Sequence, residues 1–152
     1  MLFRSRLRLA SVHALVASGD AMPFAPGLFD RVLLDAPCSG LGVLRRRPEA
    51  RWRAQPEQLE QLAGLQQRLL AAAAIAVRPG GRLVYSVCTL SRIETLGVDA
   101  WAQEHLPDFD AIDPPGAPFR PHGRGAIVLP HSVGSDGMFV LVLQRRADAQ
   151  DG

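Results

Sequence analysis

The stretch that decides the fold reads FDRVLLDAPCSG and covers residues 29–40. Its centre, Val32–Leu34, is continuously apolar, which is typical of a strand buried on both faces and therefore parallel to its neighbours. The run ends in a polar turn that carries Cys38. A second segment of this kind, YSVCTLS at residues 85–91, places Cys88 after another apolar run. Catalytic groups of open α/β sheets gather at the carboxyl ends of the strands, so we expect the two thiols to share one site.

The rest of the chain predicts strands and helices that alternate. Pro56 opens the longest helix, because proline suits the first helical turn and leucines follow at helical spacing. Strand, helix, strand, helix and a terminal hairpin indicate a Rossmann-like α/β fold in a single domain, residues 1–152. We expect strands at Val12–Val16, Phe29–Leu34, Arg82–Val87, Ala126–Leu129 and Met138–Leu143, helices at residues 2–10, 56–76 and 93–106, a loop at Asp113–Pro118 and a frayed tail from Asp148.

Composition limits the classes of function. The chain has 152 residues with a formal net charge of +2, and all 17 of its basic residues are arginine. Coding bias in a GC-rich genome explains the arginine usage, and so does an RNA substrate, since the guanidinium suits phosphates and stacks on bases. Two cysteines without a signal peptide indicate a reducing compartment, so we expect a cytoplasmic protein. No apolar run is long enough to span a membrane, and we expect no membrane association.

Four polar positions are candidates for chemistry. Cys88 is followed by Thr89 in a polar setting, whereas Cys38 precedes Gly40, where a substrate can approach the backbone closely. Either thiol could instead be an inert core residue. Asp35 ends a buried run, where a carboxylate without a partner is costly, although a turn or N-cap role would also explain it. Asp20 follows the preceding strand in the same way, in ordinary turn chemistry.

Metal chemistry is not expected. The four histidines, at positions 13, 105, 122 and 131, are scattered and have no ligand spacing with the cysteines. Glycine motifs of nucleotide hydrolases and of nucleophile elbows are also missing from the sequence.

Taken together, the segments resemble a known family. The stretch at residues 29–40, the run Arg45-Arg46-Arg47-Pro48 with Arg51-Trp52, and YSVCTL at 85–90 are similar to the Sun/Fmu-type (RsmB-like) RNA cytosine-5 methyltransferases. The similarity extends to Gly19-Asp20-Ala21 upstream and to Asp136-Gly137-Met138-Phe139 downstream. It therefore covers nearly the whole chain.

The resemblance implies roles for these residues. Cys88 matches the cysteine that attacks C6 of a target cytosine, with Val87 in place of the usual threonine, and Cys38 matches the cysteine that assists elimination at C5 and product release. C5 takes its methyl group from S-adenosylmethionine. Asp35 would contact the base or the cofactor, and Asp20 the nucleoside part of the cofactor. The arginines beside the site would contact RNA, or else form a solvated face. These RNA-binding candidates are Arg45, Arg46, Arg47 and Arg51.

The family holds its cofactor mainly through a glycine-rich loop after the first strand and an acidic residue after the second, and the sequence contains neither. We therefore expect an incomplete methyltransferase fold, in which a missing amino-terminal portion or another chain completes the sheet. The expected function is methylation of cytosine in RNA, with ribosomal RNA as the substrate class. The alternative is a non-catalytic remnant that binds RNA or a partner protein.

Overall fold

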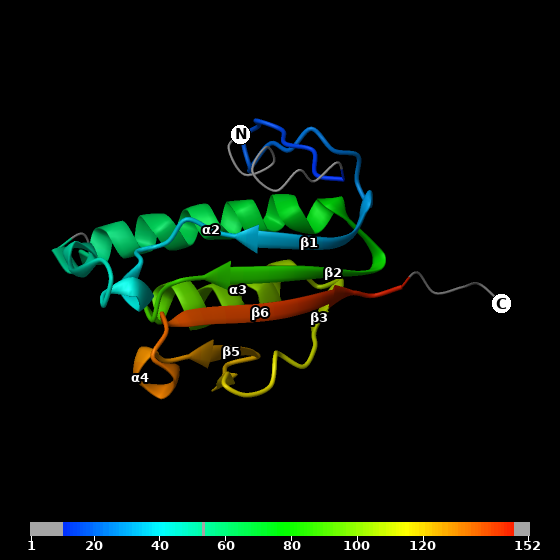
Figure 1. The fold of residues 1–152 in the computed structure, drawn as a ribbon. Coiled ribbons are helices and arrows are strands. Elements are labelled where there is room, and N and C mark those ends of the chain that lie inside the picture. Colours follow the sequence, from blue (N-terminus) through cyan, green and yellow to red (C-terminus); the bar gives the residue numbers. More distant parts are fainter. Residues whose placement is uncertain (1–10, 53, 148–152) are drawn as a thin grey trace.

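The computed structural model describes residues 11–52 and 54–147. The expected helix at residues 2–10 and the tail from Asp148 lie outside these residues. A six-stranded sheet dominates the fold, with strand order β1-β2-β6-β5-β4 and β3 paired to β6 (Figure 1). The strands are β1 (Phe29–Asp35), β2 (Val77–Val87), β3 (Phe109–Ala111), β4 (Arg120–His122), β5 (Gly125–Val128) and β6 (Met138–Arg145). The α/β prediction is confirmed.

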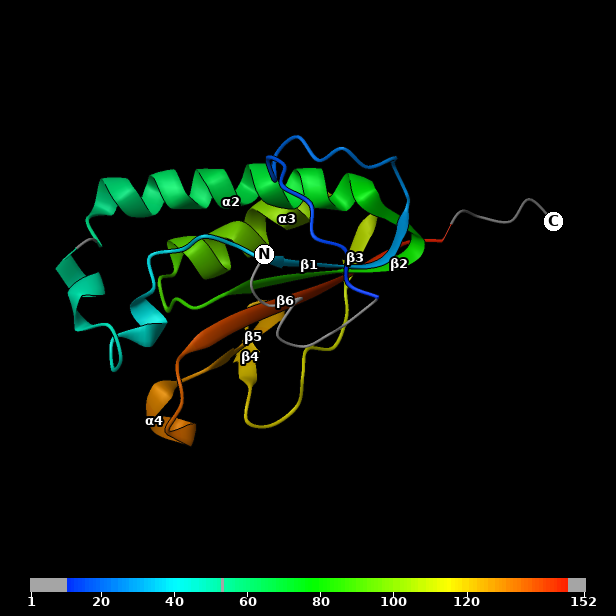
Figure 2. The same ribbon diagram turned by 45° about the horizontal axis from the view of Figure 1, so that its top comes forward.

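The two longest helices lie on the same face of the sheet (Figure 2). The two longest are α2 (Pro56–Ala76) and α3 (Val98–His105), and the shorter turns are η1 (Leu41–Val43), η2 (Pro48–Trp52), the π-helical η3 (Ile93–Gly97) and α4 (Pro130–Val133). Proline stands in the first turn of α2 and Glu57 beside it, as a helix N-terminus favours. None of the described helices combines the length and apolar character that crossing a bilayer requires.

The crossover from β1 through α2 to β2 positions the site. The two strands are parallel, with Val32 opposite Leu83 and Asp35 opposite Ser86. Their carboxyl ends therefore stop side by side. On the helical side, Leu70 of α2 and Leu83 of β2 belong to the buried core. The same core continues through the antiparallel pairing of β2 with β6.

Two expectations about strands are wrong. Residues 12–16 form no strand, and Val16 is fully exposed. Residues 12–16 pair with none of the described strands, and an unpaired apolar segment gains nothing from extended geometry. Strand β1 is also not buried on both faces, because Leu33 is 68% exposed and, among the described residues, only β2 pairs with it.

Other boundaries differ in detail. Strand β2 begins at Val77, before the expected Arg82, and the predicted helix at 93–106 divides into η3 and α3. Strands β3 and β4 and the helix α4 were not expected. The terminal hairpin of β5 and β6 is confirmed as an antiparallel pair.

Candidate active site

The two cysteines meet at the carboxyl ends of β1 and β2. Cys38 lies three residues after the end of β1 and Cys88 directly follows β2, and their sulfur atoms are 3.4 Å apart. The backbone keeps the two segments together, since the amide of Ala36 donates to the carbonyl of Ser86 over 3.0 Å. Both thiols are half-buried and free. The prediction that the two thiols lie together is confirmed, and their roles stay predictions.

The surroundings of Cys38 favour its protonated form. Burial raises the pKa of Cys38 from 9.0 to about 12, and the hydrogen bond with Cys88 adds to the effect. At neutral pH Cys38 therefore keeps its proton. A thiol that stays protonated is a poor nucleophile.

Gly42 fixes the loop after Cys38 through backbone contacts with two other segments. The amide of Gly42 donates to the carbonyl of Cys88 over 3.0 Å, and the amide of Gly137 donates to the carbonyl of Gly42 over 2.8 Å. A Cβ atom at position 42 would lie 2.1 Å from the carbonyl oxygen of Gly137. Only glycine allows three backbone segments to approach this closely.

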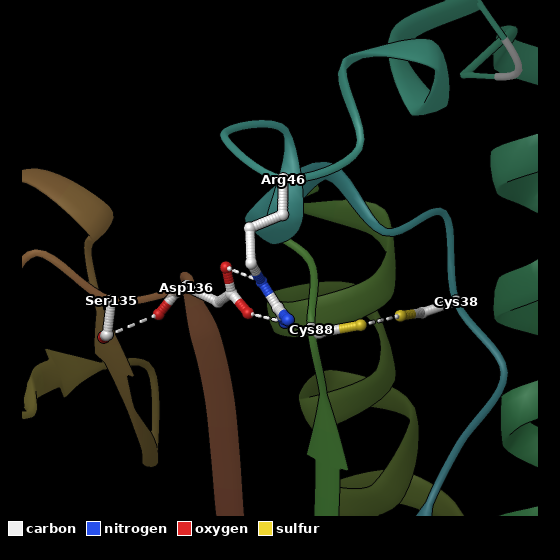
Figure 3. A network of polar contacts seen from close by, with 5 residues as sticks. All are labelled: Cys38, Arg46, Cys88, Ser135 and Asp136. Atoms are coloured by element: carbon white, nitrogen blue, oxygen red, sulfur yellow. Dashed lines mark hydrogen bonds and ion pairs between the residues drawn. The ribbon is translucent and has the colours of Figure 1, made fainter.

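The arginines predicted to contact RNA lie in different surroundings. Arg46 forms a two-bond ion pair with Asp136 from the loop before β6, with Nε 3.0 Å from Oδ1 (Figure 3). The hydrogen bond holds the pKa of the Asp136 carboxyl below its usual range and raises that of Arg46. Arg47 lines the cavity described below, whereas Arg51 lies over the ring of Trp52 at 4.6 Å. Arg45 is exposed.

The two aspartates occupy different places. Asp35 lines a cavity of about 950 Å³ together with Cys38 and Cys88. It is exposed, so the expectation of a costly buried carboxylate is wrong: within the part of the chain that the structure describes, β1 pairs on one edge only, and its last residue faces solvent. Asp20 is exposed and accepts a hydrogen bond from Ser18, which lowers its pKa. Asp20 is not among the described residues that line the cavity.

Sequence reasoning missed a buried polar network beneath the thiols. Glu94 of η3 has no exposed surface and accepts hydrogen bonds from side chains or amides of Ser39, Gln66 and Thr89. Tyr85 donates its hydroxyl proton into the same network, beside the side-chain oxygen of Gln66 and the carbonyl of Glu94. The sequence contained one signal for this network. Glu94 lies five residues after Thr89, close enough for a tight turn to bring its side chain back to the end of β2.

Comparisons with known proteins give matches over most of the chain. A family model described as 16S rRNA methyltransferase RsmB/F matches residues 2–144. The chain is 39% identical to the Bacillus subtilis protein named probable ribosomal RNA small subunit methyltransferase B, over 93% of this chain and 33% of that protein. It is 41% identical to ribosomal RNA small subunit methyltransferase F of Escherichia coli, over 79% of this chain and 26% of that protein.

Solved structures share the fold. PH0851 superposes with a TM-score of 0.89 at 31% identity, covering 94% of this chain and 33% of that one. NSun6 from Pyrococcus horikoshii, solved with SFG, gives a TM-score of 0.76 at 25% identity, covering 95% and 37%. The chain thus spans about a third of the length of the proteins that it matches.

Proposed function

The chain belongs to the RsmB/F family of 16S rRNA methyltransferases, and from that premise we propose that it carries the two-cysteine part of a cytosine-5 methyl-transfer site for RNA. The observation that supports this most directly is the 3.4 Å distance between the sulfur atoms of Cys38 and Cys88. Two thiols this close can act in successive steps on one base: the first adds to the base, and the second assists its release.

Cys88 is the proposed nucleophile. Its thiolate forms a bond to C6 of cytosine, and the electron pair of the C5–C6 double bond moves into the ring, so that C5 becomes nucleophilic. This covalent step replaces one difficult methylation with two easier reactions. After C5 has gained its methyl group, loss of the C5 proton restores the double bond and breaks the C6–S bond, which returns the Cys88 thiolate.

Cys38 is proposed to accept that C5 proton. Contact with Cys88 contributes to the raised pKa of Cys38, through a hydrogen bond and through charge. Once Cys88 is bonded to carbon it carries neither a proton nor a charge. The pKa of Cys38 then falls, so the thiol can give its proton to solvent, and the resulting thiolate accepts the C5 proton when release requires a base.

The cofactor in this proposal is S-adenosylmethionine, which when bound supplies the methyl group. The cavity of about 950 Å³ is large enough for a nucleobase and part of such a cofactor, and its wall contains donors and acceptors, Asp35 and Arg68 among them. Support also comes from NSun6, solved with the S-adenosylmethionine analogue SFG. Asp35 would hold the base or the cofactor, and Asp20 the cofactor's nucleoside part.

RNA is the proposed partner. Arg47 lines the cavity, and Arg45 and Arg51 are exposed close by, where guanidinium groups can contact phosphates. Arg46 is committed to Asp136, so its proposed role is to hold the loop rather than to bind RNA alone. The predicted cytoplasmic location belongs to the same proposal.

A second candidate function is supported by the free edge of β1. The strand pairs only with β2 among the described residues, and the chain spans about a third of its relatives. An open edge with an exposed leucine invites pairing with another strand. We therefore propose that a further portion of polypeptide completes the sheet; if none does, the chain would be a non-catalytic module that binds RNA or protein.

Trapping separates these functions. The chain is incubated with RNA that carries 5-azacytosine, with and without S-adenosylmethionine, and denaturing gels are examined for a covalent complex. We expect a complex with the wild-type chain and none with Cys88→Ala. The matched control is Cys38→Ala, which keeps the proposed nucleophile. RNA binding without any covalent complex would contradict the enzymatic proposal and favour the second candidate.

A further inference from the structure

One carboxylate touches the segments of both cysteines. Glu94 Oε1 accepts from the amide of Ser39 over 2.9 Å, and Glu94 Oε2 accepts from the hydroxyl of Ser39 over 2.5 Å and from that of Thr89 over 3.1 Å. Ser39 directly follows Cys38, and Thr89 directly follows Cys88. The two hydroxyls also lie 2.8 Å from each other. The spacing between the thiols is therefore tied to a single side chain on a third element, η3.

The residue before Cys38 is held by the same network. Gln66 of α2 donates to the carbonyl of Pro37 over 2.9 Å and to Glu94 Oε1 over 3.0 Å. Both Gln66 and Glu94 have no exposed surface. Cys38 thus lies between two residues, Pro37 and Ser39, whose polar groups are fixed by buried partners.

We propose that Glu94 is a positioning residue that sets the relative placement of the two thiols. It does not touch the reacting atoms. Buried hydrogen bonds to a carboxylate are short and strong, and an edge strand such as β1 supplies little packing of its own to fix the loop that follows it. Removal of Glu94 breaks four hydrogen bonds and loosens the segment after Cys38 from the end of β2.

The inference rests on the proposed function for its catalytic meaning, but its test requires neither RNA nor cofactor. The chain has only two cysteines, so its thiol chemistry reports on this pair alone. An aromatic disulfide such as DTNB reacts with the first thiolate, which forms a mixed disulfide and releases one thionitrobenzoate. The second thiolate then attacks the mixed disulfide, forms the Cys38–Cys88 bond and releases another. The rate of this second release measures how well the thiols are placed.

The decisive variants are Glu94→Ala and Glu94→Gln. In Glu94→Ala we expect the second release to slow about ten- to a hundredfold, because misplacement by about 1 Å has effects of that size. In Glu94→Gln the amide oxygen can still accept from the Ser39 amide and from Gln66, and the hydroxyls of Ser39 and Thr89 can turn to accept from the new amino group. We expect this conservative variant to react at close to the wild-type rate.

The matched control is Asp99→Ala. Asp99 is a second buried acid on the adjoining helix α3, and it binds Arg124 away from the thiols, with Oδ1 2.8 Å from Nε. We expect its loss to lower stability while leaving the second release unchanged. Should Glu94→Ala not fold, Thr89→Val removes one hydroxyl at equal volume and is expected to slow the second release by a smaller factor.

Two results would overturn the proposal. One is a folded Glu94→Ala variant, or Thr89→Val in its place, that closes the disulfide at the wild-type rate. The other is an Asp99→Ala variant that slows closure as much as Glu94→Ala, which would make the effect one of general stability. The DTNB assay contains no RNA, so its outcome does not depend on the trapping experiment with 5-azacytosine RNA. Failure of one experiment therefore does not contradict the proposal that the other one tests.

Discussion

Strands β1 and β2 each carry one of the thiols, yet they are held in different ways. Strand β2 pairs on both edges, with β1 and with β6, and Leu83, Tyr85 and Val87 on it are fully buried. Strand β1 pairs on one edge within the described residues, and its Leu33 is 68% exposed. Cys88 therefore extends from a strand fixed by packing, whereas Cys38 lies in a loop held by hydrogen bonds from η3 and α2 to its neighbours Ser39 and Pro37. The proposed nucleophile therefore follows a strand paired on both edges, and the proposed base lies in a loop held by side-chain hydrogen bonds.

The largest effect is expected in the core of β2. Leu83→Ala removes a fully buried side chain between α2 and the sheet, and it should lower the free energy of unfolding by about 2–5 kcal/mol. Urea unfolding followed by circular dichroism measures this loss. A loss below about 1 kcal/mol would mean that β2 is not the packed centre of the fold.

The next effect is expected at the contact of three backbone segments. Gly42→Ala places a methyl group against the carbonyl of Gly137, and the loop has to move to admit it. Overpacking of this kind costs about 1–3 kcal/mol. Thermal unfolding gives the stability loss, and DTNB kinetics should show a slower second release. Gly134→Ala, where a new Cβ atom meets nothing within 4 Å, offers a comparison outside the site, although its positive φ adds strain of its own.

Alkaline pH should remove the contribution of the Cys38 proton to the free energy of unfolding. Its pKa is raised in the folded chain from 9.0 to about 12, so the folded state binds the proton more tightly than the unfolded state does. The resulting stabilisation is complete below pH 9.0 and is lost as the pH rises toward about 12. Urea unfolding across this range should show a smaller decline for Cys38→Ala than for the wild-type chain. Parallel declines would contradict the raised pKa.

The smallest effect is expected on the open face of β1. Leu33→Ala should change the free energy of unfolding by no more than about 0.5 kcal/mol, because the side chain packs little in the isolated chain. Leu33 and Leu83 are the same residue type on adjacent paired strands, so the pair of variants compares the two environments directly. If Leu33→Ala costs as much as Leu83→Ala, the edge of β1 is covered in solution.

The sequence predicted the elements whose pattern is local. The apolar run of β1, the leucine spacing of α2 and the hairpin of β5 and β6 each depend on neighbouring residues, and all three are confirmed as elements, although β1 is not buried on both faces. Residues 12–16 carry an equally suggestive pattern, but a strand also needs a partner edge, which local sequence does not reveal. Strands β3 and β4 have three residues each, too few for a periodicity to be recognised.

Only those parts of the site that follow from local sequence and strand order were predicted. The two thiols follow from the rule that strand ends meet, and so does the position of Asp35 at the cavity. Glu94 was missed because an acid in a helical segment resembles an exposed residue. Its burial depends on Ser39 and Gln66, which lie 55 and 28 positions away in the chain. The exposure of Asp35 was missed because it depends on what lies beside β1.

The division of labour between the thiols is the central claim, and one measurement tests it most directly. The chain and its Cys38→Ala, Cys88→Ala and double variants are incubated with cytosine-containing RNA and S-adenosylmethionine, and covalent complexes are mapped by mass spectrometry. The account predicts that Cys38→Ala accumulates a complex linked through Cys88, because release is impaired, and that both variants lacking Cys88 form none. A complex that accumulates in Cys88→Ala, linked through Cys38, would contradict the assignment.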